Sequence, residues 1–130
     1  DTRSEKFNQL AQNDKAQVCW YFSKTREQYR FSCNALVMTA DDNFDLVKQQ
    51  WDKLSDAGKK QFFWGEPGTP RNDGSALHIE GDFKQVPSHF CTLLLAIQTV
   101  DYLNLRGNPQ NREWHQKDEN GNWVSQSLIP

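Results

Sequence analysis

The sequence predicts a small antiparallel β-barrel with peripheral α-helices, formed by a single domain that spans residues 1–130. Apolar and polar residues alternate in several segments, as is typical of strands, and short turn-prone segments join them. Helical periodicity is confined to a few short stretches, so strands outnumber what a parallel α/β sheet would show. A chain of 130 residues is long enough for one such core and too short for two.

The composition excludes several classes of function. Fifteen basic and seventeen acidic residues leave a net charge of −2, whereas a general nucleic-acid-binding protein normally has a basic excess. No apolar stretch reaches the length that crosses a bilayer, and no leader segment precedes the domain, so we expect a cytoplasmic protein without nucleic-acid or membrane partners. The cysteines and histidines are scattered, and we therefore predict no disulfide framework and no metal site.

The first elements follow from the apolar spacing. Residues 3–13 are expected to form a helix with Phe7 and Leu10 on one side. A strand over 18–22 follows, apolar on both faces, and after a polar turn a second strand is expected over 28–39. Because only a short loop separates these strands, we expect them to pair antiparallel.

Two further helices are predicted next in the chain. Asp42 is expected to cap a helix that lies on the core, because its apolar residues recur at three- and four-residue steps. These residues are Phe44, Val47, Trp51 and Leu54. Ser55 is expected to cap a shorter helix over 56–63.

The C-terminal half is predicted to return to strands after a long loop. Residues 65–87 are rich in glycine and proline and are expected to form that loop. The strands that follow are expected over 90–97, 100–105, 112–117 and 122–128, the last two joined by a turn at Asn120-Gly121. Six strands do not close a barrel, so we expect the unpaired edge to be covered by a partner or by a further segment.

The opening hexapeptide, Asp1 to Lys6, has two interpretations. Arg3, Ser4 and Lys6 at the start of a helix would complete a phosphate site, because the first-turn N–H groups and the helix dipole both favour an anion. Thr2 with Glu5 three residues later also fits a capping box, in which side chains satisfy the same N–H groups without a ligand.

Three segments together resemble a known family. Residues 20–32, 61–68 and 105–112 are similar to the FMN-binding split barrels related to pyridoxamine 5'-phosphate oxidase, in the branch common in cyanobacteria and proteobacteria. The resemblance extends in order from Asp1 to Pro130. It implies an antiparallel FMN-binding split β-barrel, FMN as cofactor, a small-molecule substrate and a homodimer.

The resemblance also assigns roles to residues. It places Ser4 and Lys6, with Arg3 beside them, at the FMN phosphate. It matches Gln28 to a glutamine that reaches the flavin ring and Arg112 to an arginine that contacts FMN, often across a dimer interface. From the residues alone, Gln28 could equally be an exposed strand residue and Arg112 an ion-pair partner.

The sequence also departs from the family pattern. The strands that normally precede the first helix are missing, so the chain is expected to be N-terminally truncated or to have lost part of the site. The Arg-x-His pair that handles substrate in true pyridoxamine-phosphate oxidases is replaced by Arg106-Gly107-Asn108, in which Arg106 could hold a substrate phosphate or anchor its loop.

Three hypotheses about function result from these observations. The first is an FMN-dependent oxidoreductase acting on a small substrate such as pyridoxine or pyridoxamine phosphate; because the flavin supplies the chemistry, no catalytic side chain is predicted. The second is a flavin- or tetrapyrrole-binding module of the same fold without turnover. The third is a truncated, cofactor-free dimerisation fragment.

Overall fold

The computed structural model describes residues 1–71, 77 and 81–130, and these form two compact units. The first unit comprises residues 1–13 and 36–94, and the second comprises residues 14–35 and 95–130. The single domain over 1–130 stays a prediction. Of the loop predicted over 65–87, residues 72–76 and 78–80 lie outside the described part.

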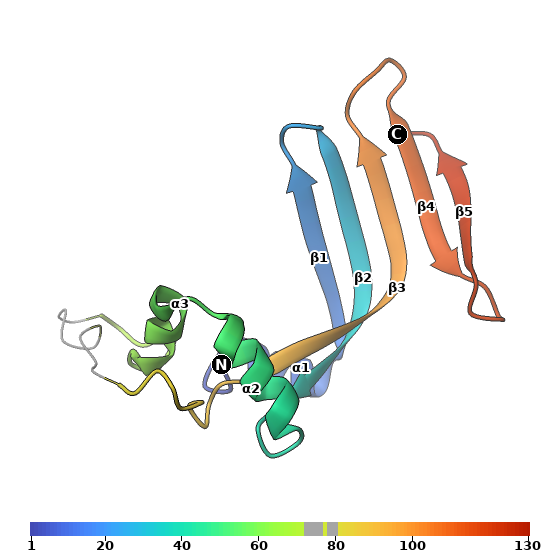
Figure 1. Ribbon diagram of the computed structural model, residues 1–130. Coiled ribbons are helices and arrows are strands. Elements are labelled where there is room, and N and C mark those ends of the chain that lie inside the picture. Colours follow the sequence, from blue (N-terminus) through green and yellow to red (C-terminus); the bar gives the residue numbers. More distant parts are fainter. Residues whose placement is uncertain (72–76, 78–80) are drawn as a thin grey trace. The chain divides into compact units, whose positions relative to one another are not determined.

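The described chain contains one five-stranded sheet, whose strands follow one another in the order β1-β2-β3-β4-β5 (Figure 1). The strands are β1 (Lys15–Phe22), β2 (Glu27–Met38), β3 (Thr92–Asn104), β4 (Asn111–Lys117) and β5 (Trp123–Leu128). The pairs β1/β2, β3/β4 and β4/β5 are antiparallel. The predicted class, mainly antiparallel β with few helices, is confirmed.

The prediction of six strands was wrong, because the segments 90–97 and 100–105 belong to the single strand β3. The polar residues Gln98 and Thr99 had suggested a break there. They contain neither glycine nor proline, however, and Thr99 already pairs with Gln116 of β4, so the strand continues through them.

The first strand also differs from the prediction. β1 begins at Lys15 rather than at residue 18, and its register with β2 is continuous from Lys15 opposite Asn34 to Phe22 opposite Glu27. The strand was predicted to be apolar on both faces, and in this chain its apolar residue Trp20 is 59% exposed. The apolar pattern predicted that a strand forms here, but it did not show which of the apolar side chains would be buried.

The predicted turn at Asn120-Gly121 is confirmed. It joins β4 to β5, where Asp118 N–H donates to the carbonyl of Asn122 at 2.8 Å. Gly121 has a φ of +82°, a conformation that glycine adopts without the steric cost of a Cβ atom.

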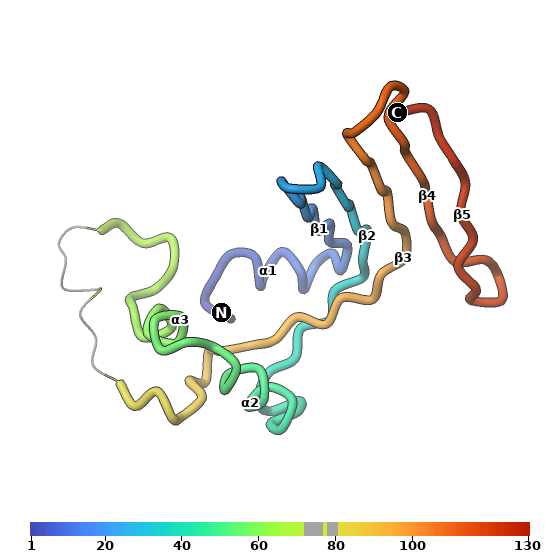
Figure 2. Tube along the Cα trace, turned by 45° about the horizontal axis from the view of Figure 1, so that its top comes forward, coloured from blue at the N-terminus to red at the C-terminus, as the bar shows by residue number. Residues whose placement is uncertain are grey.

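The first unit contains the helices α1 (Glu5–Gln12), α2 (Phe44–Lys53) and α3 (Asp56–Lys60) and the 3₁₀ turn η1 (Gln61–Phe63), and Figure 2 traces α2 directly into α3. The helix predicted over 56–63 is therefore α-helical only to Lys60 and continues as the 3₁₀ turn η1. Ser55 caps α3 as predicted, accepting from Gly58 N–H.

Two predicted helix caps were wrong. The capping box of Thr2 and Glu5 does not form: Ser4 is the N-cap residue of α1, and its side chain makes no capping bond. Asp42 instead closes a turn, accepting from both the N–H and the hydroxyl of Thr39, while Asn43 caps α2 by accepting from Leu46 N–H. A carboxylate one residue earlier in the chain can satisfy the turn but cannot also reach the first turn of the helix.

The core of the first unit lies against α2. Val47 and Trp51 are fully buried, and they pack with Phe90 in one hydrophobic cluster, as the predicted apolar stripe requires. The indole N–H of Trp51 donates to the carbonyl of Phe83 at 3.0 Å, so the segment after residue 81 is attached to α2. Phe44, also part of the predicted stripe, is 56% exposed.

Candidate functional site

Gln28 and Arg112 lie on the same face of the sheet in the second unit. Side chains alternate along a strand, so Gln28 and Arg30 of β2 share a face. On β3 and β4, Asp101 lies opposite Trp114, and Arg112 is two residues before Trp114, so Asp101 and Arg112 also share a face. An ion pair of 3.3 Å between Arg30 and Asp101 shows that it is the same face.

Arg112 is held by the carboxylate of Asp101. Asp101 is only 7% exposed, and Arg112 donates to it through Nε and Nη2, each at 3.0 Å. This side-on pair fixes the plane of the guanidinium, and the hydrogen bond and charge of Asp101 raise the pKa of Arg112. The ion pair allowed for Arg112 from the sequence therefore forms; a contact with FMN stays a prediction.

Sequence reasoning missed Asp101 and Arg30. A signal for them exists: Asp101 is the single acidic residue within β3, at a position whose neighbours on the same face are Thr99 and Leu103. A carboxylate in the middle of an apolar strand requires a cationic partner, and an arginine occurs on each neighbouring strand. Only the register shows that Arg30 and Arg112 are these partners.

Gln28 offers an amide that no residue in the described part of the chain uses. The residue is half-buried on β2, opposite Tyr21 of β1. Its side chain makes no hydrogen bond with any residue that the structure describes. A partly buried amide has both donors and an acceptor to offer, so the position can serve a ligand with a mixed hydrogen-bonding edge.

Arg3 is occupied by contacts within the first unit. Its guanidinium donates to both carboxylate oxygens of Asp1, at 3.0 and 2.7 Å. It also donates to the carbonyls of Phe62 and Trp64, at 3.3 and 3.2 Å. Through these four contacts Arg3 links the N-terminal turn to η1. Among the hexapeptide residues predicted at the phosphate, Arg3 is therefore the least available to a ligand.

Ser4 and Lys6 line one shallow cavity of about 130 Å³ in the first unit. The Ser4 hydroxyl donates to the carbonyl of Asp1 at 2.8 Å and retains its acceptor and its position at the start of α1. Lys6 is exposed, and among the described residues its ammonium group has no hydrogen-bond or ion-pair partner. Since no side chain caps α1, this helix start combines uncapped N–H groups with a lysine.

Arg106 anchors its own loop in the second unit. Its guanidinium donates to the carbonyl of Lys24, in the turn between β1 and β2, at 2.5 Å. The backbone supports the same connection, because Leu105 N–H donates to the carbonyl of Arg26 at 2.9 Å. Of the two roles considered from the sequence, anchoring is the one for which the structure shows contacts.

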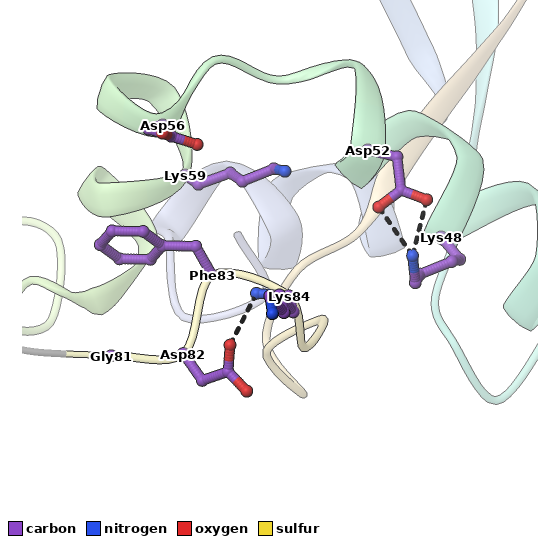
Figure 3. A pocket seen from close by; sticks show the side chains of 8 residues that line it. All are labelled: Lys48, Asp52, Asp56, Lys59, Gly81, Asp82, Phe83 and Lys84. Atoms are coloured by element: carbon purple, nitrogen blue, oxygen red, sulfur yellow. Dashed lines mark hydrogen bonds and ion pairs between the residues drawn. The ribbon is translucent and has the colours of Figure 1, made fainter.

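A larger hollow of about 500 Å³ in the first unit is lined by lysines and aspartates from α2, α3 and the segment 81–84 (Figure 3). Lys48 and Asp52 pair at 2.6 Å, and Lys84 N–H donates to Asp82 at 3.0 Å. Lys59 lies 5.7 Å from the centre of the Trp51 ring. None of the residues predicted for a site lines this hollow.

Similarity to solved structures identifies the family. Over its whole length the chain matches a pyridoxamine 5'-phosphate oxidase-related, FMN-binding protein from Nostoc punctiforme, with 37% sequence identity, a TM-score of 0.91 and coverage of 70% of that protein. The chain belongs to this family. The family model described as pyridoxamine 5'-phosphate oxidase, FMN-binding domain, matches residues 1–39, which include Ser4, Lys6 and Gln28.

The chain is also similar to one relative by sequence and to a second solved structure by fold. Pyridoxine/pyridoxamine 5'-phosphate oxidase 2 from Arabidopsis thaliana is 33% identical over 114 residues, which is 83% of this chain; the chain spans 58% of that relative's length. The structure of PhzG from Burkholderia lata, solved in complex with tetrahydrophenazine-1-carboxylic acid, matches with a TM-score of 0.80. The match covers 99% of this chain and 65% of the PhzG chain. At 16% identity, PhzG shows the shared split-barrel fold alone.

No group of three or more histidine, cysteine, aspartate or glutamate side chains is arranged to hold a metal ion in ranges 1–71, 77 and 81–130. Within the same ranges, every helix is too short or too polar to span a bilayer.

Proposed function

We propose that this chain binds FMN, with Ser4 and Lys6 as ligands of the phosphate and Gln28 and Arg112 as ligands of the flavin ring. The observation that carries the proposal is the shared sheet face of Gln28 and Arg112. On this face the amide of Gln28 has no partner among the described residues, and the guanidinium of Arg112 is held in a fixed plane. The match of the whole chain to an FMN-binding relative supports it.

The residues present fit FMN in part. Lys6 and the uncapped start of α1 offer positive charge and N–H donors, which suit a phosphate. Arg112 uses Nε and one N–H of Nη2 for Asp101, which leaves N–H groups for an acceptor on the cofactor. Arg3 fits poorly, because Asp1 and two backbone carbonyls already occupy it.

We further propose that the FMN-bound protein oxidises a small substrate, with pyridoxine or pyridoxamine 5'-phosphate as the first candidates. The name of the Arabidopsis relative supports this choice. When bound, FMN accepts a hydride equivalent from a carbon next to an amine or hydroxyl group and returns the electrons to oxygen. The side chains of this chain then have to bind and orient, and none is required as a nucleophile.

The decisive experiment is titration of the purified protein with FMN, followed through quenching of flavin fluorescence. We expect saturable binding, and then hydrogen peroxide release when pyridoxine 5'-phosphate is added in air. A matched titration with riboflavin isolates the phosphate contribution, which should account for most of the affinity if Ser4 and Lys6 bind it. Equal affinity for riboflavin and FMN would contradict the phosphate assignment.

A second candidate, FMN binding without turnover, is favoured by one observation. Arg106, the residue considered for a substrate phosphate, donates to the carbonyl of Lys24 and so supports a loop. Saturable FMN binding with no peroxide from either vitamin B6 phosphate would support this candidate. A titration with haem in place of FMN then tests the tetrapyrrole-binding form.

We also propose a homodimer. Large apolar side chains are exposed on the strands of the second unit, among them Trp20, Phe22 and Trp123 with exposures of 59%, 43% and 48%. Burial of such a surface in a second copy would stabilise association. Light scattering at micromolar concentration with FMN bound should give twice the monomer mass, and a monomer that retains FMN would contradict the proposal.

A further inference from the structure

We infer that Asp101 is a positioning residue of the proposed FMN site, one that fixes Arg112 and Arg30 on the sheet face that carries Gln28. The inference rests on the proposed FMN binding. It adds to the site two residues, Asp101 and Arg30, that the sequence analysis did not assign to it.

The geometry places Asp101 between two arginines. It lies on β3, and its partners Arg30 and Arg112 lie on the neighbouring strands β2 and β4. Both guanidiniums meet at Oδ2, at 3.3 Å from Arg30 and 3.0 Å from Arg112, while Oδ1 accepts from Arg112 Nε. One carboxylate therefore sets the direction of two cationic side chains across three strands.

Burial shows that Asp101 acts through these arginines. Its side chain is 9% exposed, whereas those of Arg30 and Arg112 are 42% and 31% exposed. A ligand on this face would contact the exposed edges of the guanidiniums, and the carboxylate would have little free surface to offer. Asp101 is thus placed to orient the binding groups without contacting the ligand.

The charges support the same role. Two guanidiniums and one carboxylate leave a net positive charge on the face that is proposed to hold the flavin ring. Without the carboxylate, the two arginines would repel each other and turn toward water, because each would lose its strongest partner. Loss of Asp101 should therefore leave both positive groups in place but make their orientation less ordered.

The test compares carboxylate-to-amide changes on the two faces of the sheet. D101N should weaken FMN binding about tenfold, since the amide has no charge to pair with the guanidiniums and only one acceptor oxygen, and should alter the visible circular dichroism of bound flavin. D101E should recover part of both signals. The matched control is E113Q: Glu113 is adjacent to Arg112 on β4, so it lies on the opposite face, and its replacement should leave FMN affinity unchanged.

A double-mutant cycle separates positioning from a general structural role. If Asp101 acts through Arg112, D101N should cost much less affinity in the R112Q background than in the wild type. Equal losses in both backgrounds, or wild-type FMN affinity in D101N, would overturn the inference while leaving the proposed function intact. Absence of FMN binding by the wild-type protein would instead overturn both.

Discussion

The Nε2 atom of His89 lies 2.5 Å from the carbonyl oxygen of Phe62, and the guanidinium of Arg3 donates to the same oxygen at 3.3 Å. Burial lowers the pKa of His89, and the charge of Arg3 lowers it further, although the bond to Phe62 opposes them. The neutral ring, with Nε2–H as donor, is therefore the form that the folded first unit favours.

This arrangement predicts a pH dependence of stability. Because the folded pKa of His89 lies below the ordinary value of about 6.5, the unfolded chain binds more protons between the two values. Its contribution to stability is complete above about pH 6.5 and is lost as the pH falls through the folded pKa. Thermal unfolding should show a Tm that declines from pH 7.5 toward pH 5, and H89Q should flatten this decline.

A matched histidine variant is the control for this prediction. H115Q removes an imidazole that lies in the second unit, 3.3 Å from Glu113, and should retain the decline of the wild type. Glu27 and Asp42 also have lowered pKa values, each mainly through a side-chain hydrogen bond, from Thr25 and Thr39. Their contributions are lost only near pH 4, so a decline confined to that range in the wild type would contradict the assignment to His89.

Arg3 and Lys6 should give opposite results when replaced. R3M removes contacts to Asp1, Phe62 and Trp64 and should lower the free energy of unfolding by about 1–3 kcal/mol. K6E breaks no contact in the described chain and should change stability by less than about 0.5 kcal/mol, yet weaken FMN binding about tenfold by placing a like charge at the phosphate. Urea unfolding and flavin fluorescence measure the two effects, and unchanged FMN affinity in K6E would refute the phosphate assignment.

Replacement of Gln28 should weaken FMN binding and leave the stability of the fold unchanged. Q28L removes an amide that has no partner among the described residues, so the free energy of unfolding should stay within about 0.5 kcal/mol of the wild type. Loss of one hydrogen bond to the flavin should weaken FMN binding by about two- to tenfold. In Q28E the shape is kept, but the N–H donor is replaced by a carboxylate oxygen, so an affinity equal to or below that of Q28L is expected if the N–H group is the contributor. A marked loss of stability in Q28L would point to a structural role instead.

Trp51 should be the most sensitive position of the first unit. W51F leaves space where the indole was fully buried and leaves the carbonyl of Phe83 without its donor, so we expect a loss of about 2–4 kcal/mol in urea unfolding. Phe44 on the same helix provides the control: it is 56% exposed, and F44L should cost less than about 1 kcal/mol. Comparable losses in both variants would mean that the core is not centred on Trp51.

Local patterns were sufficient for most of the elements. The apolar stripe of α2 places Val47 and Trp51 in the core because a helix with a 3.6-residue repeat must bury that side. Asn120-Gly121 specifies its turn because Gly121 adopts a positive φ. Local patterns failed where two neighbours offered the same chemistry, because Asn43, rather than Asp42, caps α2. They also failed at Gln98 and Thr99, two polar residues that stay in β3, where Thr99 pairs with Gln116 of β4.

The sequence by itself determined the family, the antiparallel character of the sheet and the residue types available for an anionic cofactor, because these depend on periodicity and on short motifs. Only the tertiary structure decided which of those residues remain available. It joined Arg112 to Asp101 across two strands, enclosed Arg3 among backbone carbonyls and left the side chains of Lys6 and Gln28 without partners in the described chain. The physical reason is that a hydrogen bond or an ion pair depends on distances between segments far apart in sequence, and strand register and helix position set those distances.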